Sequence, residues 1–358
     1  MRLLIVNVGS SSLKLSALGD DDELDAERAI DLWDGDDTPI GEFVRVVGKI
    51  DAVGHRVVHG GVAYTAAVEV DDDVIRELRD LTSLAPLHQP RAIAGMQAAR
   101  RALPDVPQVA CFDTAFHSTL PPAASVYALP KMWRERWPIR RFGFHGLSHA
   151  YAARRVAVLA GVAAAELQLV SCHIGAGASL CAIRAGVSVD TTMGFTPLEG
   201  LVMATRAGSI DPGLVLWLLQ TGGLTVQEVR DGLERDGGLS GLAGTPDMRE
   251  VLDRRARGDV DATLAFDVYT HRLRREIGAM SASLDLVGAC VFTGGVGEHA
   301  PAVRAASGLE LDADVNVRTT GDGEITASGA RVRTFVVTAR EDLEMAAQMR
   351  TLLREAGP

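Results

Sequence analysis

Aromatic residues and cysteines are scarce in this sequence. Phe, Trp and Tyr make up 5% of the 358 residues, so we expect a core built mainly from Ala, Val and Leu. The cysteines contain no C-x-x-C pair, and each lies in an apolar run. Buried free thiols are therefore expected, rather than a metal site or a disulfide framework. These cysteines are Cys111, Cys172, Cys181 and Cys290.

Long apolar runs and basic runs are missing as well. No segment stays apolar for the length of a bilayer span, and Met1–Asn7 turns polar too early for a secretory signal. We therefore expect a cytoplasmic protein with no membrane partner. The net charge of −11, without a basic cluster, makes nucleic acid a poor candidate partner. An anionic substrate would need a local cluster of Arg, His or metal ions.

The apolar residues, 47% of the chain, follow a pattern that predicts a globular α/β protein of two domains. Strands are expected at 3–8, 13–18, 106–112, 167–172, 179–183, 288–292 and 331–337, with further strand-like sequence at 44–58. Helices are expected at 72–81, 90–103, 146–159, 212–219, 226–233, 262–284 and 341–353. The acidic stretches at 20–25 and 34–37 are typical of a solvated loop or an irregular hairpin.

Two segments far apart in the chain resemble each other. The strand Leu4–Val8, the turn Gly9–Ser12 and the strand Leu13–Leu18 have the same order as a strand, a Gly-Ala-Gly turn and a strand within Leu169–Ile183. A repeated hairpin at the start of each half suggests a duplicated domain. Two such domains with facing hairpins can hold a nucleotide in the cleft between them.

Turns of small residues expose backbone N–H groups that can converge on phosphate oxygens. The turn Gly9–Ser12 adds hydroxyl groups, Lys14 adds a positive charge, and Asn7 offers an oxygen suited to hydrated Mg²⁺. An ordinary tight hairpin is the alternative. The sequence has no G-x-x-x-x-G-K-[ST] motif and no G-x-G-x-x-G after a strand, which disfavours P-loop and Rossmann folds.

Four polar side chains are candidates for catalysis. Arg56 lies in His-Arg-Val-Val-His-Gly-Gly, and a guanidinium fork matches a carboxylate or a phosphate face. Asp113 follows a buried strand, where ligands of α/β sheets bind, although it can equally cap the next element. His145 stands between glycines that would present it outward, and Arg206 is followed by small residues that suit a cleft. A core loop and a solvated surface arginine are the respective alternatives.

The C-terminal half contributes three further features. Phe292–His299 is expected to be a strand followed by a glycine-rich turn with room for a flat ring such as adenine. The alternative is a strand–turn–helix junction without a ligand. Glu341 opens the last helix, where it favours the helix dipole or anchors Mg²⁺ indirectly. Asp211 before Pro212 is expected to be a helix cap.

Taken together, these segments resemble the acetate kinase family, which includes propionate kinases. The resemblance covers most of the chain in the order of the family, and the ordered set is highly specific. The segments are LLIVNVGSSSLKL, HRVVHGG, LAPLHQP, FDTAFHSTLPP, RRFGFHGLSH, SCHIGAGAS, VDTTMGFTPLEGLVMATRAGSIDPG and FTGGVGEHAPAVR.

The resemblance implies an α/β fold of two duplicated ribonuclease H-like (actin-like ATPase) domains with the nucleotide cleft between them. The N-terminal domain would comprise residues 1–117 and 342–358, and the C-terminal domain residues 118–341. The implied reaction is reversible, direct in-line phosphoryl transfer from ATP to the carboxylate of acetate, which gives acetyl phosphate and ADP. Mg²⁺ is the implied cofactor, with Mn²⁺ as an alternative, and the implied assembly is a homodimer.

The resemblance also implies a role for individual residues. Asp113 would be the catalytic carboxylate and His145 a transition-state stabiliser, while Arg56 and Arg206 would hold the substrate carboxylate and the transferring phosphoryl group. Asn7 and Glu341 would serve Mg²⁺. The methyl pocket would comprise Val58, Leu87, Phe144 and Pro197. The nucleotide would contact Lys14, His173, Ile174, Gly175, Ala176, Gly177, Asp247, Met248, Arg249, Gly295, Val296, Gly297, Glu298 and His299.

Several positions depart from the pattern of the family. Ala176 and His299 replace asparagines, Met248 replaces a frequent Phe, and Gln89 replaces an Asn; the region from residue 18 to 53 is also short. These changes concern nucleotide affinity more than reaction type. Gly295 remains small, as does Val296, which favours adenosine over pyrophosphate alone. The open alternatives are a kinase for propionate or another short-chain acid and a non-catalytic nucleotide-binding regulator.

Overall fold

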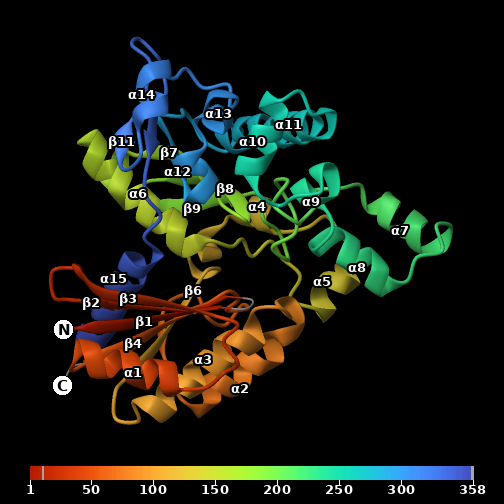
Figure 1. The fold of residues 1–358 in the computed structure, drawn as a ribbon. Coiled ribbons are helices and arrows are strands. Elements are labelled where there is room, and N and C mark those ends of the chain that lie inside the picture. The colour runs from red at the N-terminus through yellow and green to blue at the C-terminus, as the bar shows by residue number, and fades with distance from the viewer. Residues whose placement is uncertain (10–11, 356–358) are drawn as a thin grey trace. The chain divides into compact units, whose positions relative to one another are not determined.

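The computed structural model describes residues 1–9 and 12–355. The chain divides into two compact units (Figure 1). Unit 1 comprises Met1–Ser118, Phe144–Tyr151 and Arg340–Pro358, and unit 2 comprises Thr119–Gly143 and Ala152–Ala339. The hydroxyl groups of Ser10 and Ser11, which we expected near phosphate, lie outside the described residues.

Unit 1 is built on a six-stranded sheet with the order β3-β2-β1-β4-β6-β5. The strands β1, β4 and β6 are parallel, while β2, β3 and β5 run antiparallel to their neighbours. Their bounds are Leu3–Val8 (β1), Ser12–Leu18 (β2), Leu24–Asp31 (β3), Ala52–Val57 (β4), Val68–Glu69 (β5) and Gln108–Phe112 (β6). The carboxyl ends of three neighbouring strands therefore meet at one edge of this sheet.

Helices cover both faces of this sheet (Figure 1). Alternate apolar residues of β1 and β2 pack against α1 and α3 on one face, and the remaining ones pack against α15 on the other. The bounds are Thr38–Val47 (α1), Asp72–Asp80 (α2), Gln89–Ala102 (α3), Gly146–Ala160 (α6) and Glu341–Glu355 (α15), with short 3₁₀ helices η1 (Leu81–Leu84) and η2 (Ala115–Thr119).

The sheet of unit 2 repeats this arrangement strand for strand, in the order β11-β12-β10-β7-β8-β9. Again a hairpin (β7 and β8) opens the sheet, a third antiparallel strand follows, and β7, β10 and β12 are parallel. The bounds are Gln168–Ile174 (β7), Ala178–Arg184 (β8), Val187–Thr191 (β9), Ala289–Thr293 (β10), Gly323–Glu324 (β11) and Arg333–Val336 (β12). The predicted duplication is thus confirmed.

Unit 2 carries more helices than unit 1, and five of them, α7 to α11, lie in the segment between β9 and β10 (Figure 1). The longest, α11, packs against β7 and β8 and against α9 and α10. The bounds are Pro122–Ser125 (α4), Lys131–Arg136 (α5), Ala164–Glu166 (η3), Pro212–Gln220 (α7), Val226–Glu234 (α8), Gly238–Ala243 (α9), Met248–Ala256 (α10), Val260–Ala282 (α11), Gly294–His299 (α12), Pro301–Ala305 (α13) and Ala313–Arg318 (α14).

The main error in the sequence-based assignment falls between residues 20 and 50. Part of the strand-like region at 44–58 is the end of helix α1. The acidic stretch at 20–25 belongs to an irregular hairpin, one of its two expected structures, in which β3 pairs antiparallel with β2. Proline near the first turn of α1 and buried Ile40 and Phe43, three residues apart, are helix signals that the nearby valines obscured. Strand β3 has an exposed, charged pattern because it lies at the sheet edge.

Three smaller expectations are confirmed. The four cysteines are free and buried, and Asp211 caps α7 by accepting a hydrogen bond from the N–H of Gly213. Glu341 is the first residue of the last helix. Among the described residues, no helix has both the length and the apolar character needed to cross a bilayer.

Candidate active site

Three polar side chains of unit 1 lie at the carboxyl ends of its parallel strands. Asn7 is near the end of β1, Arg56 near the end of β4, and Asp113 directly follows β6. The register pairs Val6 with His55, so Asn7 is level with Arg56. Arg56 pairs with Cys111, so Asp113 lies two residues beyond that level, just past the end of β6. Lys14 lies opposite Asn7 on the antiparallel strand β2. Strand ends of this kind are where α/β sheets bind ligands.

The guanidinium of Arg56 is shared by two carboxylates. Nε and Nη2 donate to Asp113 at 2.9–3.2 Å, and Nη1 lies 2.8 Å from Oε2 of Glu341 at the start of α15. The side chain of Asp113 is 2% exposed, whereas those of Arg56 and Glu341 are 19% and 17% exposed. One cation therefore faces two acidic groups in a largely buried site.

This arrangement shifts the pKa values of both partners. Burial alone would lower the pKa of Arg56, but the charges of Asp113 and Glu341 outweigh burial and raise it. Burial, with repulsion from Glu341, raises the pKa of Asp113 to about 6 despite the hydrogen bonds from Arg56. The cluster carries more negative than positive charge when both carboxyl groups are ionised.

His145 is held beside Asp113 through the backbone. It has a positive φ of 57°, and the N–H of the next residue, Gly146, donates to the carbonyl of Asp113 at 2.9 Å. A Cβ at Gly146 would lie 2.3 Å from that carbonyl oxygen, so only glycine permits this approach. Helix α6 begins at Gly146, so the backbone directly after His145 is held in a helix.

The apolar residues expected around the substrate methyl group have different exposures. Phe144 is buried and contacts the ring of His59 edge-on, with ring centroids 5.5 Å apart. Val58, directly before His59, is partly buried, whereas Leu87 is 37% exposed. Burial also lowers the pKa of His59 to about 4, which keeps this ring neutral beside Phe144 at neutral pH.

In the sheet of unit 2, β7 and β10 hold the positions that β1 and β4 hold in unit 1. His173 on β7 pairs with Thr293 on β10, and α12 starts at Gly294 immediately after β10. Gly294 has a φ of 79° and packs so closely on Ile174 that a Cβ would lie 2.9 Å from the carbonyl oxygen of Ile174. The β7–β8 turn closes with a hydrogen bond from Gly175 N–H to the Gly177 carbonyl.

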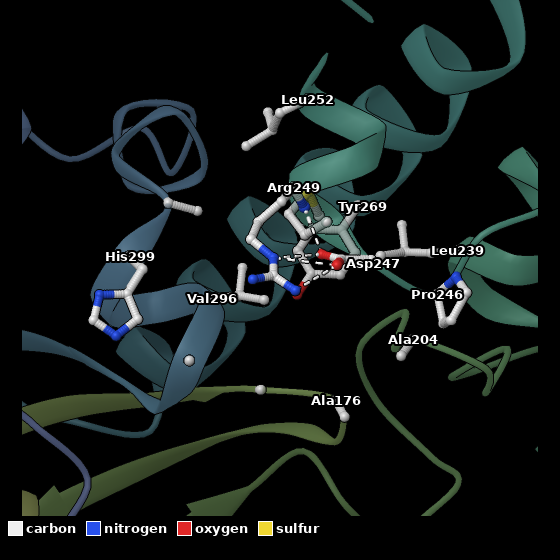
Figure 2. Close-up of a pocket in the computed structure, with 14 residues that line it drawn as sticks. Ala176, Ala204, Leu239, Pro246, Asp247, Arg249, Leu252, Tyr269, Val296 and His299 are labelled. Atoms are coloured by element: carbon white, nitrogen blue, oxygen red, sulfur yellow. Dashed lines mark hydrogen bonds and ion pairs between the residues drawn. The ribbon is translucent and has the colours of Figure 1, made fainter. Parts of the chain in front are cut away.

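A pocket of about 520 Å³ opens in unit 2 beside this turn (Figure 2). Its size lies within the usual range for small-molecule sites. Eight of the residues expected around the nucleotide line it, from the β7–β8 turn, the start of α10 and helix α12. They are Gly175, Ala176, Asp247, Met248, Arg249, Gly295, Val296 and His299.

The other six residues expected at the nucleotide lie outside this lining, including Lys14 on β2 and His173 on β7. Ile174 is fully buried, and Gly177 and Gly297 contribute to the turn and to α12. The buried carboxylate of Glu298 accepts from the N–H groups of Gly294 and Ala339, both at 2.9 Å. Glu298 therefore fastens the glycine-rich turn to the segment after β12.

Six lining residues were not identified from the sequence. Ala204 and Ala300 lie inside the segments that carry the family resemblance but have no polar side-chain group, and the other four lie outside those segments. Tyr269 differs from the others because it brings a hydroxyl group from the long helix α11. The six are Ala204, Leu239, Pro246, Leu252, Tyr269 and Ala300.

Arg206 and Pro197 are brought together within unit 2. Nη1 of Arg206 donates to the carbonyl of Pro197 at 2.9 Å and also contacts the sulfur of Met203 at 3.7 Å. Burial lowers the pKa of Arg206, although the charge of Glu234 partly opposes this shift. No carboxylate lies within ion-pair distance of Arg206 in the described part of the chain, so its charge is available to an anionic ligand.

The donors in unit 1 fit a hard divalent cation. The described residues contain no group of three or more His, Cys, Asp or Glu side chains arranged to hold a metal. Asn7 and Glu341 nevertheless offer oxygen ligands, and the excess negative charge around Arg56 suits a cation. Magnesium is commonly held by one or two protein oxygens together with water and substrate phosphates.

The duplicated sheets with their opening hairpins define a protein of two actin-like ATPase domains. The model of the acetokinase family matches residues 40–347. The chain belongs to the acetokinase family.

Its relatives are similar over nearly the whole chain. The acetate kinase of Synechococcus sp. is 45% identical over 90% of this chain and 81% of its own length, and that of Trichormus variabilis is 40% identical over 99% and 100%. The crystal structure of Porphyromonas gingivalis acetate kinase has a TM-score of 0.91 at 32% identity, covering 98% of this chain and 99% of its own. A propionate kinase from Francisella tularensis has a TM-score of 0.90 at 31% identity, covering 97% and 98%.

Proposed function

We propose that this chain is an acetate kinase, which transfers the γ-phosphoryl group of ATP to the carboxylate of acetate and yields acetyl phosphate and ADP. The observation that carries the proposal is the Arg56 guanidinium shared by Asp113 and Glu341 at the strand ends of a chain in the acetokinase family. The bond from the γ-phosphorus to the bridging oxygen of ADP breaks as the bond to the carboxylate oxygen forms.

The main barrier to this reaction is repulsion between two anions. Acetate is already ionised at neutral pH, so no base is needed to create the nucleophile. The planar guanidinium of Arg56 matches the geometry of a carboxylate or of a phosphoryl face. A substrate oxygen would accept some of the hydrogen bonds that Arg56 donates to Asp113 and Glu341 in this structure. Positioned charge of this kind lowers the energy of the transition state.

Asp113 is proposed to orient Arg56 and the transferring group, since its carboxylate accepts hydrogen bonds from both Nε and Nη2 of the guanidinium. His145 is proposed to donate to the phosphoryl oxygens, because its backbone is locked next to Asp113. Arg206 would supply a second positive charge. Asn7 and Glu341 would hold Mg²⁺, with Mn²⁺ as a substitute, and the ion would neutralise the phosphate charge when bound.

The acid is proposed to place its alkyl group against Val58, Leu87, Phe144 and Pro197. The buried Phe144 ring packs against the neutral ring of His59, which directly follows Val58, so this part of unit 1 is apolar. Propionate is the second candidate acid, because the Francisella tularensis relative is a propionate kinase of similar structure. Unit 2 would bind the nucleotide, with His173, Ile174, Gly177, Gly297 and Glu298 supporting the phosphates and the glycine-rich turn at the adenosine. Lys14 of unit 1 is proposed to contact the phosphates as well.

A hydroxamate assay tests this function directly. Purified protein with ATP and Mg²⁺ is offered formate, acetate, propionate and butyrate, and hydroxylamine traps any acyl phosphate. Acetate is expected to give the highest kcat/KM, and removal of Mg²⁺ with EDTA is expected to abolish the signal. If ADP binds but no acid yields a hydroxamate, the chain is a nucleotide-binding regulator instead.

We further propose that units 1 and 2 correspond to the two domains expected from the family, and that the protein is a cytoplasmic homodimer. Support for self-association comes from unit 2, where Trp133, Trp137 and Trp217 are each about half exposed. Large aromatic side chains in such positions are enriched at protein interfaces. Sedimentation analysis should give twice the chain mass of 38.0 kDa. A mass of 38.0 kDa at micromolar concentration would contradict the dimer.

A further inference from the structure

Tyr269 is a buried polar residue that lines the nucleotide pocket of unit 2. It is 3% exposed and comes from α11, which packs against the helices α9 and α10. Its hydroxyl oxygen is buried and has no hydrogen-bond partner among the described residues. Buried polar groups are nearly always hydrogen-bonded, so a hydroxyl without a partner on a residue that lines a pocket calls for a ligand or a water molecule.

The other polar side chains of this lining have partners or face solvent. Asp247 caps α10 and binds the guanidinium of Arg249 at 2.6–3.1 Å, so these two groups satisfy each other. Arg249 is 88% exposed and His299 is 65% exposed, which puts both at the rim. Tyr269 therefore supplies the one buried polar side-chain atom without a partner among the described residues of this lining.

The position of Tyr269 separates it from the expected phosphate end. Backbone N–H groups of small residues lie along the β7–β8 turn and the start of α12, including Gly175 and Gly295. Tyr269 belongs to the helical wall on the other side of the pocket from Ala176 (Figure 2). Apolar residues of that wall, such as Leu239 and Leu252, suit a flat ring rather than a phosphate.

We propose that the hydroxyl group of Tyr269 donates a hydrogen bond to a ring nitrogen of the purine base of the bound nucleotide. The inference rests on the proposed function, since it assigns the purine end of the nucleotide to this pocket. Burial raises the pKa of Tyr269, so the hydroxyl keeps its proton and acts as a donor at neutral pH. The single polar contact would fix the orientation of the base in an otherwise apolar wall.

The test is the variant Tyr269→Phe, which removes only the hydroxyl oxygen. Binding of ADP and of tripolyphosphate, which has no base, is measured by calorimetry. ADP is expected to bind about 3–10-fold more weakly to the variant, the usual effect of one hydrogen bond, with tripolyphosphate affinity unchanged. Thermal unfolding of the free variant should occur at the same or a higher temperature, because a buried hydroxyl without a partner has been removed.

The matched control is Tyr64→Phe. Tyr64 lies in unit 1, where its hydroxyl donates to Glu77, so this change should leave ADP affinity unaltered. Equal ADP affinity of Tyr269→Phe and the wild type would overturn the inference, as would an equal loss for ADP and tripolyphosphate. If the wild type itself bound no ADP, the proposed function would fail together with the inference.

A second measurement does not require the variant to fold. The wild type is tested with 1-deaza-, 3-deaza- and 7-deaza-ADP, each of which replaces one ring nitrogen by carbon. The wild type is expected to bind one of the three analogues about 3–10-fold more weakly than ADP. Tyr269→Phe should bind that analogue and ADP equally well. Equal affinity of the wild type for all three analogues and for ADP would refute a hydrogen bond to a ring nitrogen.

Discussion

Replacing Arg56 by alanine is expected to lower kcat/KM for acetate by about 10²–10³-fold or more, the cost of losing a preorganised donor to developing charge. The loss should exceed that of a simple binding contact because Arg56 also neutralises two carboxylates. Without the guanidinium, Asp113 and Glu341 would face each other and the anionic substrates with no cation between them. Steady-state kinetics with acetate and ATP measure this effect.

Two controls separate this catalytic role from general damage. Arg101 forms an exposed ion pair with Asp37, and Arg101→Ala should change kcat/KM by less than about twofold, as expected for a surface pair. Arg56→Lys keeps the charge but cannot contact two carboxylates through a rigid fork, so it should recover only part of the activity. Turnover of Arg56→Ala near the wild-type value would remove Arg56 from the proposed mechanism.

Loss of Arg56 should also change the titration of Asp113. The guanidinium lowers the pKa of Asp113, while burial and Glu341 raise it to about 6. In Arg56→Ala the opposing positive charge is gone, so the pKa of Asp113 should rise further. On the acidic side, the pH profile of any residual activity should then fall off at a higher pH than that of the wild type, which initial rates between about pH 5 and 9 would measure.

Much of unit 1 could be predicted because its local signals agree with its tertiary structure. The strands β1, β2 and β6 are apolar runs bounded by turn residues, and the hairpin in each half was visible before the sheet order was known. The sequence could not decide between a loop and an irregular hairpin around β3, because an edge strand with acidic, exposed residues has the composition of a loop. The register that places Asn7 level with Arg56 depends on non-local pairing, which local sequence does not encode.

The candidate site divides in the same way. Residues in motifs of glycine, histidine and arginine, such as Arg56 and His145, were identified because their types are chemically unusual for a strand end or a turn. Tyr269 and Leu252 could not be identified, since an apolar or aromatic residue on a helix is normally part of the core. Their contribution to the pocket depends on how α10 and α11 pack, and that packing is set by many small contacts.

The structure also assigns a role to Arg304, a buried residue that sequence reasoning passed over. Its side chain is fully buried in unit 2, yet it makes hydrogen bonds only to neutral acceptors. Nη1 donates to the carbonyls of Gly297 and Glu298 at 2.8 and 2.6 Å, and Nε and Nη2 donate to Asn316 at 2.7 and 2.6 Å. Arg304 therefore satisfies carbonyl groups at the end of α12, which have no partner within that helix, and fastens α12 to α14.

Replacing Arg304 by methionine is expected to lower the free energy of unfolding of unit 2 by about 2–6 kcal/mol, since each buried carbonyl left without a donor costs about 1–3 kcal/mol. Methionine fills much of the volume but leaves the carbonyls of Gly297 and Glu298 buried without donors. Urea unfolding followed by tryptophan fluorescence reports on this loss, because Trp133, Trp137 and Trp217 all lie in unit 2.

A control of the same chemistry is available on the neighbouring helix. Arg318 is exposed at the end of α14, so Arg318→Met should change the free energy of unfolding by less than about 0.5 kcal/mol. Because α12 also carries Gly295 and Val296 of the pocket, Arg304→Met should weaken ADP binding even below the unfolding transition. If Arg304→Met and Arg318→Met unfolded at the same urea concentration, water or other donors would have to satisfy those carbonyls, and the guanidinium would not be what holds α12 in place.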